Sequence, residues 1–237
     1  MKNLMTFDQM CELRAIEKAR IKAGKDGLRL ELQAFIARFT DGGVNVKSDD
    51  PRVLQAKVLF DKGLGGNLSF EDYLATIPEI PSTLLADDPN FPLLRLVDPR
   101  LGLEKTCELF GITFKEFGYS DADAVAFDAR HEIPATPFWV RAHDGRKNRN
   151  RRPDVCRDEC KDKIFAMTAM VAIMTWVQDP SIFKENEHIL DCPGSVHRGT
   201  RGDCAYLSVW DGEVKLGLYR DAGLPDPFCG AGGFRRE

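Results

Sequence analysis

The sequence predicts an α+β fold, in which a helical N-terminal part packs on a C-terminal antiparallel sheet built around one buried helix. Three observations predict it. Apolar residues recur at helical spacing in the first half of the chain, whereas short strand-like segments follow residue 119. Residues 164–177 carry no charged side chain, which is typical of a helix buried on most sides. Asp211-Gly212 joins two of the strand-like segments and indicates a β-hairpin.

Residues 1–118 are predicted to form the mostly helical part. We expect two helices within 7–39 and a third that begins after Asp50 and ends near Gly63. Ser69 is expected to cap a short helix, because an acidic residue follows three positions later. Five prolines within 78–99 predict a fixed, extended connection, which is the expected subdomain boundary. Residues 100–117 are predicted to be helical again.

Residues 119–237 are predicted to form the α+β part. Its central helix is expected over 154–178, with Asp154 as the N-cap and Asp179-Pro180 at its end. Each apolar side chain that such a helix buries stabilises the fold by roughly 1.5–3 kcal/mol. Strands are expected at 124–127, 137–141, 188–191, 205–210 and 213–219, the last two forming a hairpin over 205–219.

Several short motifs stand out within residues 164–234. They are Met167-Thr168-Ala169, Pro193-Gly194-Ser195, the strand Tyr206–Trp210, Lys215-Leu216-Gly217 and Gly230-Ala231-Gly232. Together they resemble the C-terminal part of an uncharacterised bacterial family, a domain of unknown function. The resemblance implies a bacterial origin and a structural role for the glycine-rich end. It implies no activity, so no functional residue is carried over from it.

The composition excludes several classes of protein. The chain has 237 residues and a formal net charge of −4, so we expect no overall attraction to nucleic acid or to anionic membranes. Its first residues lack the apolar core of a signal peptide, and the run 164–177 is shorter than the ~20 residues that span a bilayer. Seven scattered cysteines do not fit a secreted disulfide framework. We therefore expect a cytoplasmic protein without membrane contact.

The most unusual surface feature is a basic stretch just before the expected central helix. Asp144-Gly145 predicts a turn ahead of it, so its cations are expected on a loop. Guanidinium groups bind phosphates and carboxylates through forked hydrogen bonds, which makes the loop a candidate site for nucleic acid or an acidic protein surface. The alternative is a solvated loop with salt bridges to acidic neighbours. The candidate anion-binding residues are Arg146, Lys147, Arg149, Arg151 and Arg152.

Four cysteines are weaker candidates for a metal site. Cys156 and Cys160 are spaced to share one helix face, and Cys192 and Cys204 lie downstream, near His188 and His197. Thiolate and imidazole are zinc ligands, but the spacings match no zinc motif, and reduced structural cysteines are the alternative. A thiol–imidazole pair of Cys192 with one of these histidines is a further hypothesis. The patterns of zinc proteases, serine hydrolases and dinucleotide-binding folds are absent from the sequence.

Three hypotheses of function follow. The first is a non-enzymatic binding protein that needs no cofactor and contacts an anionic partner through residues 146–152. The second is a small metal- or cysteine-dependent hydrolase built from the cysteines and histidines above. The third is a purely structural or protein-interaction module.

Overall fold

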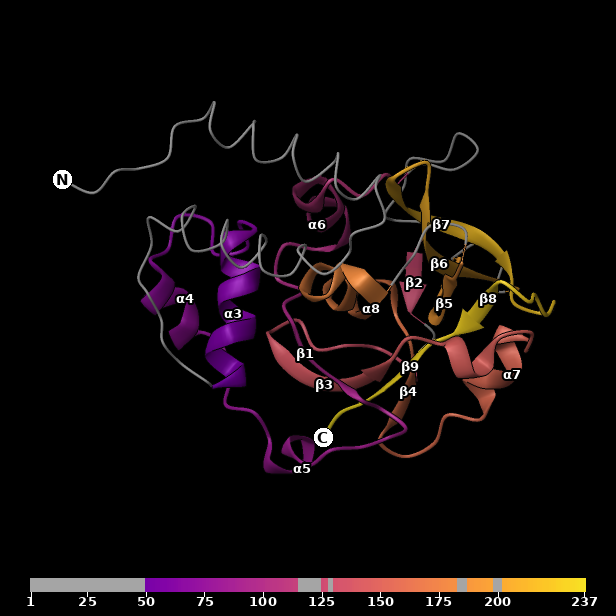
Figure 1. Cartoon of the computed structure of the whole chain (residues 1–237), viewed down its shortest axis with the longest axis horizontal. Coiled ribbons are helices and arrows are strands. Elements are labelled where there is room, and N and C mark those ends of the chain that lie inside the picture. Colours follow the sequence, from indigo (N-terminus) through magenta and orange to yellow (C-terminus); the bar gives the residue numbers. More distant parts are fainter. Residues whose placement is uncertain (1–49, 115–124, 128–129, 183–186, 198–201) are drawn as a thin grey trace, which may run out of the picture. The chain divides into compact units, whose positions relative to one another are not determined.

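The computed structural model describes residues 50–114, 125–127, 130–182, 187–197 and 202–237 (Figure 1). The two helices expected within 7–39 lie outside the described residues. The described residues all belong to one unit, Asp49–Glu237. They combine α-helices with sheets that are mainly antiparallel, which confirms the predicted α+β class. No helix among them has both the length and the apolar character needed to cross a membrane.

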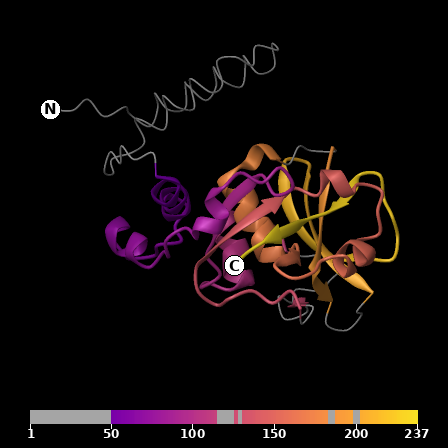
Figure 2. The ribbon, with the colours of Figure 1, turned by 90° about the horizontal axis from the view of Figure 1, so that it is seen from below.

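Four strands form the first sheet, in the order β1-β3-β9-β4. They are β1 (Leu93–Val97), β3 (Phe138–His143), β9 (Gly233–Arg235) and β4 (Ile164–Ala166). Every pairing in this sheet is antiparallel. Figures 1 and 2 both show β9 running beside β3, so the last residues of the chain complete a sheet that begins before residue 100.

The second sheet has the order β2-β5-β6-β7, and β8 pairs with β5 in parallel. Its strands are β2 (Val125–Phe127), β5 (Ile189–His197), β6 (Asp203–Trp210), β7 (Glu213–Asp221) and β8 (Cys229–Ala231). Strands β2, β5, β6 and β7 match the expected ones closely, although β5 extends six residues beyond the segment 188–191, whereas no strand is expected at β8. The sequence 192–197 is buried except for its last residue, so it lacks the alternation that marks a half-exposed strand.

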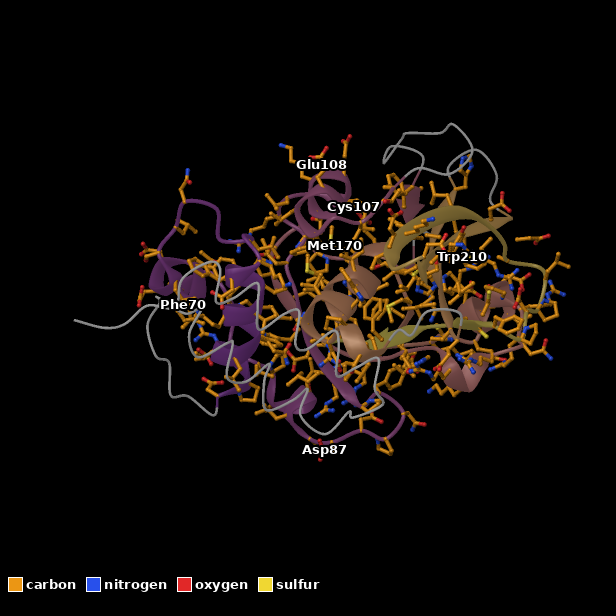
Figure 3. All side chains as sticks on the ribbon, turned by 45° about the horizontal axis from the view of Figure 1, so that its top comes forward. Phe70, Asp87, Cys107, Glu108, Met170 and Trp210 are labelled. Carbon is orange, nitrogen blue, oxygen red and sulfur yellow. The ribbon has the colours of Figure 1, made fainter. Side chains whose placement is uncertain are left out.

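Helix α8 (Ala169–Gln178) supplies the centre of the core. It contacts β1 of the first sheet and both β5 and β6 of the second, and Figure 1 shows it between them. Ile173 and Met174 are fully buried. Met170 also lies in the interior, whereas Asp87 and Glu108 lie at the periphery (Figure 3). The expectation of one buried helix with strands around it is therefore confirmed.

The single helix expected over 154–178 is not formed. The chain makes a short helix α7 (Pro153–Asp158), then strand β4, and only then α8. The N-cap of α7 is Arg152 rather than Asp154, and Asp162 adopts a positive φ of 53° that ends any helical path. Strand β4 pairs with β9, a partner about seventy residues away in the sequence. Local periodicity cannot reveal such pairing, because a short apolar run suits a strand as well as a helix.

Among the described helices before residue 118, α3, α4 and α6 follow their expected signals, whereas α5 lies in a segment expected to be extended. Helix α3 (Pro51–Asp61) is capped by Asp50, and α4 (Phe70–Ala75) begins where the Ser69 hydroxyl accepts a hydrogen bond from the Asp72 amide at 3.1 Å. Helix α6 (Leu103–Phe110) is shorter than expected, because Gly111 takes a left-handed conformation at its end. The segment 78–99 contains α5 (Ser82–Leu85) and β1, and β1 pairs with β3 over its whole length, so residues on both sides of 118 share a sheet.

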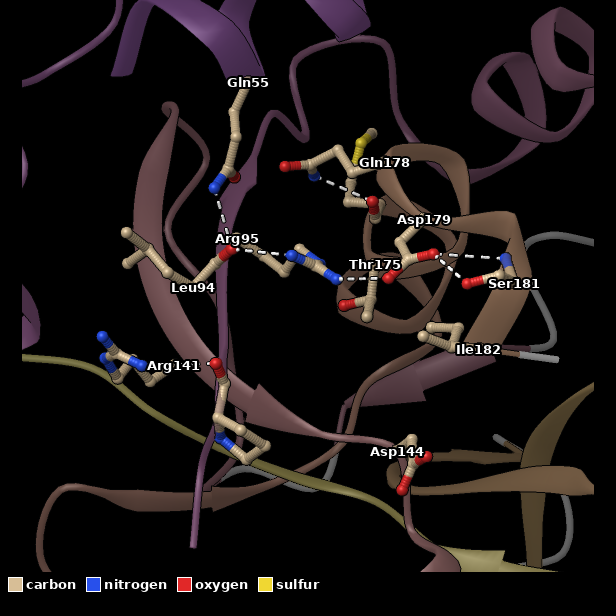
Figure 4. Close-up of polar contacts among 12 residues, drawn as sticks. Gln55, Leu94, Arg95, Arg141, Asp144, Thr175, Gln178, Asp179, Ser181 and Ile182 are labelled. Carbon is tan, nitrogen blue, oxygen red and sulfur yellow. Dashed lines mark hydrogen bonds and ion pairs between the residues drawn. The ribbon is translucent and has the colours of Figure 1, made fainter. Parts of the chain in front are cut away.

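The outer edge of β1 is closed by two glutamine side chains, and Figure 4 shows the contact of Gln55 with Leu94. The Gln55 amide donates to the Leu94 carbonyl at 2.9 Å and accepts from the Leu96 amide at 2.8 Å. The Gln178 amide donates to the Leu96 carbonyl at 2.7 Å. An amide side chain carries one donor and one acceptor group, as a peptide unit does, so α3 and α8 satisfy an edge that another strand could otherwise join.

The hairpin between β6 and β7 has the expected two-residue turn. Asp211 and Gly212 have φ values of 53° and 73°, as a type I′ turn requires. A Cβ atom added to Gly212 would meet nothing within 4 Å. The preference for glycine there is therefore conformational and not a matter of space.

We expect Gly212→Val to destabilise the protein by about 1–2 kcal/mol, because a β-branched residue resists a left-handed backbone. Gly212→Asn is the matched control, since asparagine adopts positive φ more readily and should cost less. Urea unfolding of both variants measures the difference. Equal loss of stability in the two would contradict a conformational cause.

Candidate functional site

The basic loop, residues 144–152, connects β3 to α7 and is held tightly on one side. Gly145 takes a φ of 81°, and a Cβ atom there would lie 2.2 Å from the Gly230 carbonyl oxygen. Only glycine permits this approach, which brings the loop against β8. The Asn148 side chain donates to the Ala231 carbonyl at 2.8 Å, and the Asn150 amide donates to the Asp226 carbonyl at 2.9 Å. The loop is therefore fixed to the segment 226–231.

A buried histidine holds the start of the loop. The Gly145 amide donates to His143 Nδ1 at 3.1 Å, so that nitrogen must be unprotonated. Burial, helped by the charge of Lys147 and opposed by Asp144, lowers the pKa of His143 to about 4. The imidazole is therefore neutral at neutral pH, and this anchor is intact there.

The first two cations of the loop point back onto the protein. Arg146 pairs with Asp144 and donates to the Ile182 carbonyl at 2.7 Å. Lys147 donates to the Asn90 carbonyl at 3.1 Å and lies 5.0 Å from the centre of the Phe91 ring. These contacts give Arg146 and Lys147 a structural role in anchoring the loop.

The other three cations of the loop also have partners within the chain. Arg149 donates to the Glu187 carbonyl and, at 3.4 Å, to His188 Nδ1. Arg151 pairs with Glu159 at 2.6 Å, and its side chain is 40% exposed. Arg152 pairs with Asp154 at 2.6 Å, is 52% exposed, and lowers the pKa of that carboxyl. All five candidate anion-binding residues thus contact groups of the same chain, as in the salt-bridged alternative.

An exposed apolar loop lies next to these arginines. Leu224 and Phe228 are 56% and 60% exposed, and they flank Asp226, whose carbonyl accepts from the basic loop. The Ala222 carbonyl accepts from the Asp154 amide at 3.0 Å, which ties the same loop to the start of α7. The basic stretch alone lacks aromatic residues, and the fold supplies one from residue 228. The hydrogen bonds of the basic loop to Ala231 and Asp226 bring the two segments together.

The candidate cysteines are buried thiols in separate elements. Cys156 lies in α7, Cys160 just after it, Cys192 in β5 and Cys204 in β6. Burial raises the pKa of Cys160 to about 11 and raises the pKa of Cys192 and of Cys204 well above its usual range. A protonated thiol is a poor nucleophile and a poor metal ligand.

The metal and thiol–imidazole hypotheses also lack geometric support in the part of the chain that the structure describes. Those residues include no group of three or more His, Cys, Asp or Glu arranged to hold a metal ion, so the four cysteines do not form the candidate zinc site. His188 contacts the basic loop instead, since its Nε2 lies 2.6 Å from the Asp144 carbonyl oxygen. His197 ends β5, where it pairs with Val125 of β2.

One further charged group, the buried carboxyl of Asp191, has no signal in the sequence. It lies in β5 with no exposed surface, and its Oδ1 is 3.4 Å from Arg220 Nε. Neither of its oxygens has a hydrogen-bond partner among the described residues. Burial raises the pKa of Asp191 to about 7, and the charge of Arg220 opposes this rise. In a strand with one exposed face, polar side chains such as Asp191 alternate with apolar ones and point to solvent. Both faces of β5 are covered, so Asp191 is buried instead.

Comparison with known proteins assigns no family to the chain. No family model matches it, and the searches of curated proteins and of solved structures found no match either. The resemblance to an uncharacterised bacterial family therefore stays a prediction.

The buried Asp191 should make stability depend on pH in an unusual direction. Its carboxyl ionises near pH 4 in the unfolded chain and near pH 7 in the folded one, so unfolding releases a proton between these values. We expect the free energy of unfolding to fall as pH rises from 4 to 7, by at most about 1.4 kcal/mol per pH unit from this group.

Urea unfolding at several pH values checks this expectation when the free energy of unfolding of each variant is compared with that of wild type. Asp191→Asn should remove the decline relative to wild type, whereas Asp211→Asn on the exposed hairpin turn should keep it. A wild-type pH dependence in Asp191→Asn would show that the carboxyl is already ionised in the folded protein at low pH.

Proposed function

We propose that this chain is a binding protein that docks a segment of another protein in which carboxylates alternate with large apolar side chains. The proposed contact surface, called the Phe228 surface, combines exposed apolar residues with the last three cations of the basic loop. The observation that carries the proposal is the hydrogen bond from the Asn150 amide to the Asp226 carbonyl, which joins the loop of exposed Phe228 to the basic loop. The surface consists of Arg149, Arg151, Arg152, Val155, Leu224 and Phe228.

The apolar part of this surface supports a macromolecular partner. Val155, Leu224 and Phe228 are 39%, 56% and 60% exposed. Pro225 and Pro227 are exposed as well, and prolines restrict the backbone of the loop that presents Phe228. A rigid loop loses less conformational entropy on binding, and exposed aromatic residues next to arginines are typical of the residues that dominate binding energy.

The ion pairs of the arginines leave them able to bind. An ion pair between exposed side chains contributes only about 0–1 kcal/mol, so a partner carboxylate can replace Glu159 or Asp154 at little cost. A guanidinium has five N–H donors. The contacts of Arg152 use Nε and Nη2, and those of Arg151 use Nη1 and Nη2. Donors therefore remain for a second acceptor while the present pairs stay in place.

The charge balance favours a protein partner over a nucleic acid. Asp154, Glu159 and Asp226 lie among the three arginines, and the whole chain is acidic. A chain of phosphates would meet these carboxylates as well as the arginines, and the resulting repulsion weakens backbone-driven binding. A protein segment with a few separated carboxylates can face the arginines alone and place its apolar side chains on Phe228 and Leu224.

Fluorescence anisotropy with synthetic probes tests the proposal. We expect a labelled peptide of alternating Glu and Phe or Leu to bind, and Phe228→Ala to weaken its binding about tenfold, a loss of about 1.4 kcal/mol. The double change Arg151→Gln and Arg152→Gln should weaken binding and reduce its dependence on salt. Leu68→Ala, a similarly exposed residue between α3 and α4, is the matched control and should bind like wild type.

Two further probes separate the alternatives. A peptide with Lys in place of Glu should not bind, and a single-stranded oligonucleotide should bind more weakly than the acidic peptide. The proposal would be contradicted if the acidic peptide bound the Phe228→Ala variant and the double arginine variant as tightly as wild type. It would also be contradicted if the acidic peptide did not bind the wild-type protein at low salt. Tighter binding of the oligonucleotide, lost in the arginine variant, would assign the surface to nucleic acid instead.

A further inference from the structure

A second candidate site lies at the first sheet, near the beginning of β3 and the residues that follow β9. An open cavity of about 620 Å³ is formed there by four separate segments of the chain. They are residues 78–81, residues 130–134, the first residues of β3 and the residues after β9. This volume lies within the range of small-molecule sites, roughly 300–1,000 Å³.

One wall of the cavity is apolar and rigid. Pro78, Pro81 and Pro134 line it, and proline has a fixed φ and no N–H group. Trp139 also lines it, and its indole N–H donates to the Pro78 carbonyl at 2.8 Å. That bond satisfies the polar atom and fixes the ring, which is only 3% exposed, so Trp139 supports the wall while the prolines and Phe138 offer most of its apolar surface. Phe138 adds a second aromatic ring to the lining.

The rest of the lining carries charges of both signs. Arg130 and Arg236 bring positive charge, and Glu79, Glu132 and Glu237 bring negative charge. Glu79 pairs with Arg52 at 3.4 Å, and Glu237 accepts from the Thr83 hydroxyl at 2.9 Å, so these two carboxylates already have partners. The guanidinium of Arg236 stacks on the Phe165 ring at 4.2 Å from its centre, which fixes the plane of its donors. Its Nη1 is buried and has no hydrogen-bond acceptor among the described residues. Burial lowers the pKa of Arg236 and Glu132 opposes this, so the two side chains influence each other.

We infer that this cavity binds a small zwitterion with a large apolar side chain, either a free amino acid or a short peptide. The carboxylate of such a ligand supplies an acceptor to the guanidinium groups of Arg236 and Arg130. Its ammonium group faces Glu132, and its side chain covers the wall of Trp139 and the prolines. A purely anionic ligand would meet Glu132, and a purely cationic one would meet both arginines. This site is independent of the Phe228 surface.

Calorimetric titration of the full chain tests the inference with defined compounds. L-phenylalanine and L-phenylalanyl-L-phenylalanine should show saturable binding, and the tighter of the two identifies the source of the zwitterion. The two analogues that keep the ring and one charge are 3-phenylpropanoate and phenethylamine. Each should bind at least about tenfold more weakly, because one of the two charged contacts is lost.

Variants of neighbouring residues locate the site. Arg236→Gln and Glu132→Gln should each weaken zwitterion binding about tenfold or more. Arg235→Gln is the matched control, since Arg235 is the preceding residue but pairs with Asp88 at 3.6 Å and with the Thr83 carbonyl at 3.1 Å. Arg130→Gln replaces Arg236→Gln if the latter does not fold. Absence of saturable binding by either zwitterion would overturn the inference, and so would binding that the Glu132 and arginine variants leave unchanged.

Discussion

The packing of α8 between the two sheets is the contact on which the rest of the structure depends. Eight of its ten residues are buried, so both sheets are positioned by one apolar surface. A buried helix must also satisfy the polar groups at its ends. At the start of α8 the Thr168 hydroxyl accepts from the Val171 amide at 3.4 Å, and the Ser195 hydroxyl accepts from the Ala169 amide at 2.9 Å. Strand β5 thus completes the helix cap.

This arrangement requires β5 to approach the segment before α8 very closely. The Gly194 amide donates to the Met167 carbonyl at 2.8 Å, and a Cβ atom on Gly194 would lie 2.5 Å from the Ala166 carbonyl oxygen. The sequence Pro193-Gly194-Ser195 therefore has a structural explanation: glycine permits the approach, and the serine caps the helix. Because β8 pairs with the other end of β5, the same strand also positions the Phe228 surface.

Features with a local cause can be predicted from the sequence, and features with a distant cause cannot. Pro51, Ser69 and Asp211-Gly212 specify their own backbone conformations, so α3, α4 and the hairpin follow from a few adjacent residues. The local sequence predicts helix where β4 forms, because the pairing of β4 with β9 is invisible in it. Composition alone reveals the basic loop. It does not reveal that the loop of exposed Phe228 adjoins it, because tertiary hydrogen bonds to Asp226 and Ala231 bring the two segments together. The partners of the arginines are likewise set by the tertiary structure.

The glutamine contacts at the outer edge of β1 have a consequence for the order in which the chain is made. Gln55 precedes β1 in the sequence, whereas β3 and Gln178 follow it by roughly forty and eighty residues. During synthesis, the side chain that blocks this edge therefore leaves the ribosome before the edge itself does. A half-made chain already holds an intramolecular acceptor and donor for Leu94 and Leu96 while their strand partner is still missing. Helix α3 is thus complete before β1, so the side chain that closes one edge of β1 is available as soon as that strand is made.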